Sequence, residues 1–248
     1  MKQWMCLALL GCFSWLHGVA CAAPAVQVVG DDHILSRPMP NNEVTGPGAD
    51  LVREVMHRAN MSFSFNILPW ARAYAMAESQ GEVMIINLGR TAEREGKFKW
   101  VGEIIPVEYR MVKLKSRKDI QIKTLDDARN LQIGVQNQDI CHRYLISKGF
   151  SVTSLQMSAG YEQAFTKLLL ERVDLVPRSH IGIRDFCEKS PQDCDKIETA
   201  YRLDEVNTSL YMAFSKQTPD EVVARARKAY EQIRLDGTWQ KIMAPLLK

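Results

Sequence analysis

Residues 68–94 read LPWARAYAMAESQGEVMIINLGRTAER, and the rest of the chain is organised around this segment. Pro69 followed by Trp70 is typical of the start of a short helix, and Gly81 ends that helix. The apolar run at 83–86 predicts a buried strand, which a polar turn follows. Because the turn comes at the end of a strand, we expect its side chains to point out of the sheet.

The polar turn carries groups that can hold a small anion or a carboxylate. They are the side chains of Asn87, Arg90, Thr91 and Arg94 and the accessible backbone of Gly89. Guanidinium groups bind carboxylates through paired hydrogen bonds. The alternative is a solvated helix start, in which these arginines pair with Glu93 and Glu95 and contribute little to stability. The turn by itself leaves both interpretations open.

Composition and charge argue against one class of partner. The chain has 248 residues, 46% of them hydrophobic, which suits one large domain or two small ones. Its formal net charge is +3, from 32 basic and 29 acidic residues spread along the chain. Because no basic face and no acidic tail stands out, we expect no nucleic-acid partner.

The N-terminus has the composition of a secretion signal. Lys2 precedes an apolar run at 5–16, and Ala20-Cys21-Ala22 offers small residues for cleavage by signal peptidase. At about 12 residues the run is shorter than the roughly 20 that cross a membrane. We therefore predict a signal peptide at residues 1–22 and a periplasmic mature protein. Lipid attachment is the alternative, since two segments in this region resemble lipobox patterns.

Three cysteines remain after cleavage at that site. Cys187 and Cys194 are close in sequence, so in an oxidising compartment we expect a disulfide between them, with two free thiols as the alternative. Cys141 is then left over. It is followed by His142, but adjacent residues point in different directions, so we expect neither a metal site nor a Cys/His nucleophile there.

The order of the predicted elements indicates two α/β units. A capping box at Thr124 and Asp127 opens the second unit. The predicted strands lie at 26–29, 62–67, 83–86, 107–115, 131–135, 152–155, 173–176 and 208–214, and the predicted helices at 50–60, 69–80, 140–147, 157–171, 218–235 and 238–247. Parallel sheets of such units bind ligands at the carboxyl edge of their strands.

Five short segments carry a family resemblance. They are residues 45–51 (TGPGADL), 89–94 (GRTAER), 131–136 (LQIGVQ), 171–176 (ERVDLV) and 235–242 (LDGTWQKI). In this order they resemble the motifs of family 3 solute-binding proteins, the periplasmic amino-acid-binding class of ABC transporters. Each segment is a weak signal by itself, whereas five in order are specific. The first segment keeps Asp50 but lacks the aromatic residue of the family.

The resemblance implies a fold of the α/β class. It is the periplasmic binding protein-like type II fold, in which two α/β lobes are joined by two crossing strands and a ligand binds in the cleft between them. We expect lobe 1 to comprise residues 23–110 and 212–248, and lobe 2 residues 111–211. The chain would cross near 107–113 and 206–211. A ligand that favours the closed arrangement of the lobes would then shift the protein toward it.

The resemblance also implies a set of ligand-binding residues. Arg94 would hold a carboxylate, helped by Asn87, Gly89 and Thr91, and Asp32 and its neighbours would line lobe 1. Asn137, Gln138 and Asp139 would line lobe 2 at the start of a helix, whose free N–H groups favour an anion. Trp70 either stacks on the ligand or only packs its helix on the sheet. Tyr109 either packs at the crossing or lines the cleft.

One departure from the family bears on the kind of ligand. Amino-acid binders of the family hold the ammonium group with an aspartate at the position of Ser179, which here follows Arg178. With Arg90, Arg94 and Arg178 facing one cleft, we expect an acid rather than a zwitterion.

These observations together predict a binding protein. The chain has no nucleophile elbow, no phosphate-binding glycine loop and no metal-ligand spacing, so we expect neither an enzyme nor a cofactor. The resemblance implies a monomer that captures a small carboxylate-bearing solute and delivers it to an inner-membrane ABC permease. The alternative is an exported accessory or sensory protein of the same fold without a role in transport.

Overall fold

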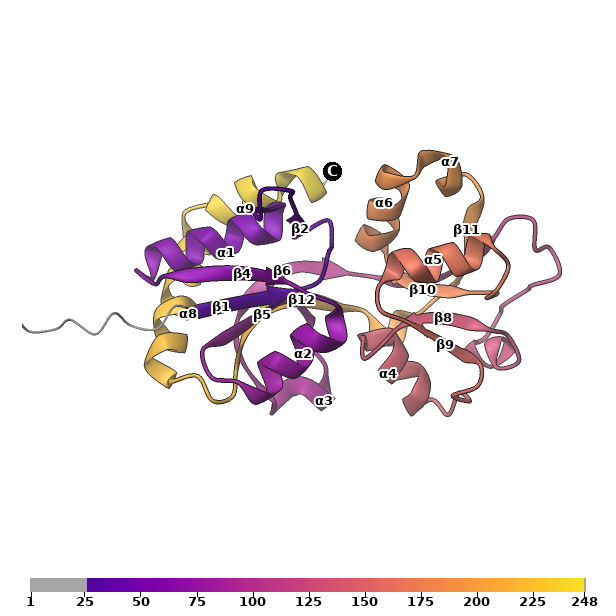
Figure 1. Cartoon of the computed structure of the whole chain (residues 1–248), viewed down its shortest axis with the longest axis horizontal. Helices are drawn as coiled ribbons and strands as arrows, with labels where there is room; N and C mark the ends of the chain where they lie inside the picture. Colours follow the sequence, from indigo (N-terminus) through magenta and orange to yellow (C-terminus); the bar gives the residue numbers. More distant parts are fainter. Residues whose placement is uncertain (1–25, 248) are drawn as a thin grey trace, which may run out of the picture.

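The computed structural model describes residues 26–247 and shows two α/β lobes side by side (Figure 1). The predicted signal peptide, residues 1–22, lies outside the described residues. Within the described part, none of the helices combines the length and apolar character that crossing a membrane requires.

Lobe 1 is built on a five-stranded sheet. In spatial order its strands are β4 (Phe63–Ile67), β1 (Val26–Gly30), β5 (Val83–Gly89), β12 (Thr208–Ser215) and β6 (Phe98–Val107). β1 pairs in parallel with β4 and β5, whereas β12 pairs antiparallel with β5 and β6. A short hairpin of β2 (Arg37–Pro38) and β3 (Val44–Thr45) follows β1.

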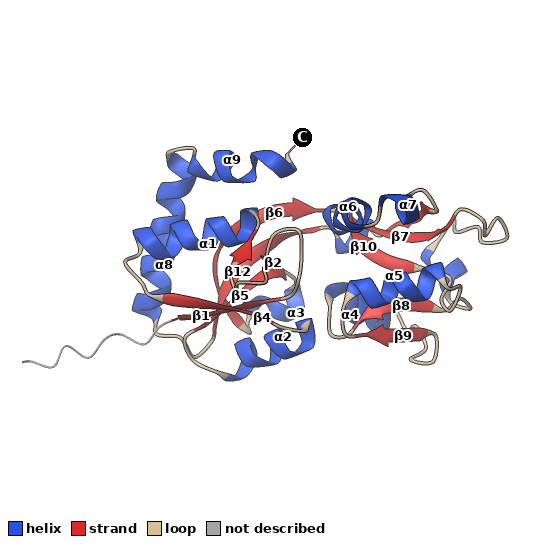
Figure 2. Ribbon diagram, turned by 45° about the horizontal axis from the view of Figure 1, so that its top comes forward, coloured by secondary structure: helices blue, strands red, loops and turns tan. Residues whose placement is uncertain are grey.

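Helices cover both faces of this sheet (Figure 2). α1 (Pro47–Arg58), α8 (Asp220–Leu235) and α9 (Thr238–Met243) pack on one face, and α2 (Trp70–Ser79) packs on the other. Successive residues of a strand point to opposite faces. Val28 and Ile86 accordingly belong to the core under α1, and Val29 and Ile85 to the core under α2. Burial on both faces explains the continuous apolar runs of these strands.

Lobe 2 repeats the alternation of strands and helices. β10 (Val176–Ser179), β7 (Tyr109–Leu114) and β11 (Ile197–Arg202) form an antiparallel sheet, and β8 (Ile133–Gln136) pairs in parallel with β9 (Leu155–Ser158). A bridge between Ile133 and Leu175 connects the two groups of strands. The helices are α4 (Ile140–Ser147), α5 (Tyr161–Leu169), α6 (His180–Lys189) and α7 (Pro191–Cys194).

The chain passes between the lobes twice. β6 ends at Val107 and β7 begins at Tyr109, so the outward crossing lies at Glu108. The return lies between β11 and β12, through a short 3₁₀ helix at Asp204–Val206. The backbone N–H of Tyr109 donates a hydrogen bond of 2.9 Å to Oδ1 of Asn207 and so ties the two crossings together. The lobe boundaries expected at 110/111 and 211/212 stay predictions.

Several predicted elements require correction. The helix expected at 157–171 begins only at Tyr161, because Met157 and Ser158 still belong to β9. The strand expected at 173–176 begins only at Val176 and runs to Ser179, because β10 is an edge strand of its sheet, a position that tolerates Pro177. The capping box at Thr124 is confirmed, although it opens a 3₁₀ helix. α6 and β11 were not predicted, since neither has a clear apolar period.

The disulfide between Cys187 and Cys194 is confirmed, and it joins the end of α6 to α7. Cys141 is a buried free thiol in α4.

Candidate functional site

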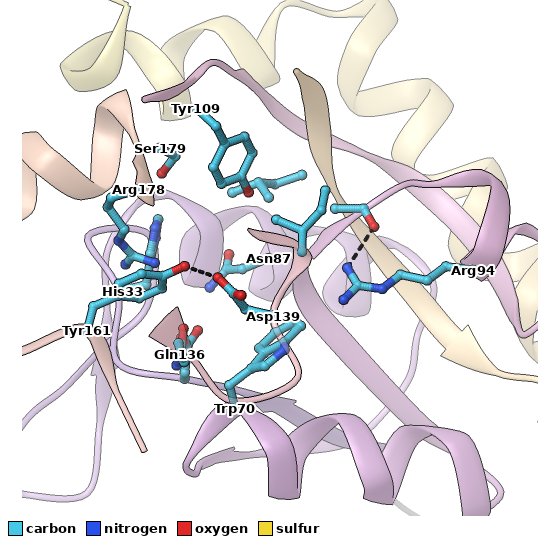
Figure 3. Close-up of a pocket in the computed structure, with 14 residues that line it drawn as sticks. His33, Trp70, Asn87, Arg94, Tyr109, Gln136, Asp139, Tyr161, Arg178 and Ser179 are labelled. Atoms are coloured by element: carbon cyan, nitrogen blue, oxygen red, sulfur yellow. Dashed lines mark hydrogen bonds between the residues drawn. The ribbon is translucent and has the colours of Figure 1, made fainter. Parts of the chain in front are cut away.

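A cavity of about 40 Å³ lies between the lobes (Figure 3). Lobe 1 lines it with Asp31, His33, Trp70, Asn87, Gly89, Arg94 and Leu210, and lobe 2 with Tyr109, Gln136, Asp139, Ile140, Tyr161, Arg178 and Ser179. Asp31, Asn87 and Gln136 stand where β1, β5 and β8 end, which is the edge at which sheets of this class bind ligands.

Arg94 is the most deeply buried charged residue of the cavity. It lies in α3 (Ala92–Glu95), directly after the turn that follows β5, and its side chain is 1% exposed. Nη1 donates to the carbonyl of Gly89 at 3.1 Å, and the guanidinium lies 5.2 Å from the centre of the Tyr74 ring. Among residues 26–247 no carboxylate forms an ion pair with Arg94. A buried cation without a counterion is costly, so Arg94 is ready to receive an anion.

Two buried carboxyl groups face the same cavity. Asp139 is the N-cap of α4, where Oδ1 accepts a hydrogen bond of 2.7 Å from the N–H of His142 and Oδ2 accepts one from the Tyr161 hydroxyl. Burial raises the pKa of Asp139 to about 7. Asp31 accepts a hydrogen bond of 3.1 Å from the Gln136 side chain, across the cleft. Burial raises the pKa of Asp31 as well, against the opposing charge of Arg178.

Arg178 and Ser179 end β10 on the lobe 2 side. Ser179 is the N-cap of α6, and its hydroxyl oxygen accepts a hydrogen bond of 3.2 Å from the N–H of Gly182. Cζ of Arg178 lies 3.4 Å from the centre of the Tyr161 ring. Burial lowers the pKa of the Arg178 guanidinium. Its Nε is buried and has no hydrogen-bond partner in the described part of the chain.

Neutral polar groups complete the lining. Asn87 has a positive φ of 57° and donates from Nδ2 to the hydroxyl of Ser36 at 2.8 Å, while its buried Oδ1 has no hydrogen-bond partner among residues 26–247. Nδ1 of His33 accepts a hydrogen bond of 3.3 Å from the N–H of Leu35. Burial holds the pKa of His33 well below its usual range, so this imidazole is neutral. The cavity therefore offers hydrogen bonds beside its charged groups.

The lobes touch each other around the cavity. The backbone carbonyl of Gln138 accepts hydrogen bonds from Nε1 of Trp70 at 3.1 Å and from Nη2 of Arg94 at 3.3 Å. Nε of Arg143 donates to Glu93 at 2.8 Å. These bonds cross from lobe 1 to lobe 2, so the structure is a closed arrangement of the lobes.

The structure brings most of the predicted site residues together. Those that line the cavity are Trp70, Asn87, Gly89, Arg94, Asp139, Arg178 and Ser179, and Gln138 reaches Arg94 through its carbonyl. Trp70 packs in the core under α2 and also lines the cavity, and its stacking on a ligand stays a prediction. Tyr109 is buried in the core at the crossing and also lines the cavity.

Four predicted residues lie outside the cavity. Arg90 pairs with Glu95 and, like Thr91, lines a separate groove of about 440 Å³. Asp32 pairs with Lys189 at 3.5 Å and lines another groove of about 630 Å³. Asn137 does not line the cavity, and its backbone N–H donates to Ser158. Of the three arginines expected to face one cleft, Arg94 and Arg178 line the cavity, and Arg90 lines the separate groove.

The sequence did not show which neighbour of Asp32 faces the cavity, and it missed four lining residues, Gln136, Ile140, Tyr161 and Leu210. Asp31 and His33 are neighbours of the predicted Asp32, and only the path of the turn after β1 decides which of the three faces inward. Gln136 is the last residue of β8, and Asn87 lies near the end of β5. Polar side chains at strand ends are expected to point out of the sheet, and this expectation could have identified Gln136 as it identified Asn87. Tyr161 was assigned to the middle of a long helix, whereas it is the first residue of α5.

Comparison with known proteins agrees with this architecture. The family model of bacterial extracellular solute-binding proteins, family 3, matches residues 34–247. No curated protein matches the chain in sequence.

Solved structures of similar fold come from sensing and binding proteins. A histidine kinase sensor domain with similarity to periplasmic binding proteins aligns with a TM-score of 0.80 and 15% identity, over 90% of this chain and 96% of that one. An ancestral arginine-binding protein bound to arginine aligns with a TM-score of 0.77 and 17% identity, over 90% and 98%. ArtJ of Geobacillus stearothermophilus, an arginine-, lysine- and histidine-binding protein, has a TM-score of 0.74 and 21% identity, over 88% and 93%. These similarities confirm the expected type II fold.

Proposed function

The chain belongs to the bacterial extracellular solute-binding proteins of family 3, and from this we propose that it captures a small carboxylate-bearing solute between its lobes. The solute is an amino acid or a related organic acid. The protein acts as a monomer in the periplasm and delivers the solute to an ABC permease of the inner membrane.

Arg94 is the observation that carries the proposal. Its guanidinium is buried, has no carboxylate partner among the described residues and lines the cavity between the lobes. A ligand carboxylate supplies the missing counterion through charge-assisted hydrogen bonds. Asp139 and Asp31 lie in the same cavity and suit the ammonium group of an amino acid. Two of the structural neighbours are amino-acid-binding proteins, which supports this class of ligand.

The size of the cavity implies a movement of the lobes. About 40 Å³ accommodates only a few water molecules, so an amino acid enters only when the lobes separate. The contacts of the Gln138 carbonyl with Trp70 and Arg94 open in this step. The ligand then closes the lobes by contacting both of them.

Calorimetric titration with a panel of amino acids and organic acids tests the binding site. Arg94→Gln is expected to weaken binding of the ligand by about 10- to 100-fold, since a hydrogen bond to a charged group contributes about 1.5–3 kcal/mol. Arg90→Gln is the matched control, because Arg90 lies outside the cavity and pairs with Glu95. Unchanged affinity in Arg94→Gln, with the fold intact by circular dichroism, would contradict the proposal.

Uptake measurements separate transport from the alternative function. The histidine kinase sensor domain among the structural neighbours makes a sensory role the second candidate. If the protein serves a permease, deleting its gene abolishes uptake of the ligand in the host. Normal uptake together with a lost transcriptional response to the ligand would favour the sensory role instead.

A further inference from the structure

Arg178 is a second buried cation of the cavity that lacks a counterion. Its side chain belongs to lobe 2, and the residue is 7% exposed. Within residues 26–247 it forms no ion pair, and its Nε has no hydrogen-bond partner. Figure 3 draws Arg178 and Arg94 at opposite sides of the pocket, with Asp139 between them. The cavity is thus flanked by two guanidinium groups from different lobes.

The surroundings of Arg178 hold it in this position, and the charge of Asp31 acts on it without an ion pair forming between them. Its guanidinium lies over the face of Tyr161, at 3.4 Å from the ring centre. Gly182 makes room for it, because a Cβ at this position would lie 2.2 Å from Nε of Arg178. Only glycine therefore permits this placement of the arginine. Because Nε of Arg178 is buried without a hydrogen-bond partner within residues 26–247 and the side chain forms no ion pair there, its burial is costly, and an anionic ligand at the cavity would lower this cost.

The two acids of the cavity have other partners. Asp31 accepts a hydrogen bond from Gln136, and Asp139 accepts hydrogen bonds from His142 and Tyr161. Burial raises the pKa of Asp139 to about 7, so this carboxyl group is partly protonated at neutral pH. Neither acid forms an ion pair with Arg94 or Arg178 within residues 26–247, so a ligand carboxylate can approach each guanidinium.

Arg178 also has space beside it. It lines both the central cavity and the adjoining groove of about 630 Å³, together with Asp31, Gln136 and Tyr161. A ligand held at Arg94 can therefore extend toward Arg178, with part of its volume in the groove and part in the small central cavity.

We propose that Arg178 receives a second carboxylate of the ligand, so that the protein selects acidic amino acids or dicarboxylic acids over their amides. One carboxylate binds Arg94 of lobe 1 and the other binds Arg178 of lobe 2, and the ligand bridges the lobes. The inference rests on the carboxylate site at Arg94 proposed above. Its distinctive consequence is discrimination between a carboxylate and an amide of nearly the same shape.

Matched pairs of ligands test this discrimination. Isothermal titration compares L-glutamate with L-glutamine and L-aspartate with L-asparagine, in the wild type, Arg178→Gln, Arg178→Lys and Arg94→Gln. The wild type is expected to bind one acid at least about 10-fold more tightly than its amide, and Arg178→Gln to weaken binding of that acid by about 10- to 100-fold while changing binding of the amide little. Arg178→Lys keeps part of the preference. Arg184→Gln, an exposed position on α6, is the control.

The outcomes separate this inference from the proposed function. Equal binding of acids and amides by the wild type, with binding lost in Arg94→Gln, overturns the second carboxylate site and leaves the first intact. A preference for acids that survives in Arg178→Gln also overturns it. If the wild type binds none of these four amino acids but binds another member of the panel that has a single carboxylate, the second carboxylate site is overturned and the first stands. If it binds no member of the panel, the carboxylate-binding function itself fails. If Arg178→Gln does not fold, the preference of the wild type and its reduction in Arg178→Lys decide the question.

Discussion

Replacing Asp139 by asparagine tests the energetic cost of burying a carboxyl group at the cavity. Asp139 is 5% exposed, and burial raises its pKa from 3.8 to about 7. Asparagine is as good an N-cap as aspartate, so the bond from the N–H of His142 is retained. The hydroxyl of Tyr161, which donates to Asp139, can accept a hydrogen bond from the new amide instead. The substitution therefore removes the titrating carboxyl group of Asp139 with little change in packing.

The sign of the effect follows from proton binding. Between pH 3.8 and about 7 the folded protein keeps the proton on Asp139, whereas the unfolded chain has lost it. The contribution of Asp139 to stability is therefore fully present below pH 3.8 and is lost as the pH rises through about 7. A shift of about three pKa units corresponds to about 4 kcal/mol. Asp139→Asn is thus expected to have little effect on stability near pH 4 and to stabilise the protein by up to about 4 kcal/mol near pH 8.

Urea unfolding at several pH values measures this difference. The protein is first unfolded and refolded to remove bound ligand, and the free energy of unfolding is then determined for wild type and variant between about pH 4 and pH 8. Asp195→Asn is the control, because Asp195 is exposed. Its difference from wild type is expected to stay constant with pH. A difference between wild type and Asp139→Asn that does not grow with pH would refute the reasoning.

Two further substitutions test the packing of lobe 1 and the contact between the lobes. Gly102→Ala would place a Cβ 2.4 Å from the Tyr230 ring, so the free energy of unfolding in urea is expected to fall by about 1–3 kcal/mol. Gly96→Ala is the control and should be nearly neutral, because no atom lies within 4 Å of its new Cβ. Equal effects of the two substitutions would contradict this reasoning. Trp70→Phe removes the donor to the Gln138 carbonyl, worth about 0.5–1.5 kcal/mol, and should increase the radius of gyration of the ligand-free protein in X-ray scattering. An unchanged radius would mean that this bond does not hold the lobes together.

Local sequence was enough to predict the features that depend on neighbouring residues. Residues 83–86 form a strand as expected, because an apolar run of this length suits a strand buried on both faces. The helix at Ile140–Ser147 has the predicted bounds, since the Asp139 cap precedes it and Gly149 follows shortly after its end. The disulfide formed between cysteines seven residues apart. Arg94 was found because it follows a buried strand within a polar turn.

Tertiary structure decided which charged groups share the cavity. From the sequence Asp32 and Arg90 were candidates for the site, yet Asp32 pairs with Lys189 and Arg90 with Glu95 outside the cavity. The direction of a side chain beyond the end of a strand depends on the path of the turn and on what packs against it. For Asp32 the contact comes from the other lobe, more than a hundred residues away in the chain.

The position of Arg178 on the lobe 2 side of the cavity also depends on tertiary structure. The sequence identifies it as a charged residue after an apolar run, but its burial depends on β10 continuing past Pro177, on Tyr161 beginning α5 and on Gly182 leaving room. These elements meet only when lobe 2 is folded. The sequence by itself therefore determined the α/β class, most of the strands of lobe 1 and the polar turn that carries Arg94, because those follow from short-range patterns. The composition of the cavity required the folded chain, because its charges come from distant segments whose burial is a property of the packing between them.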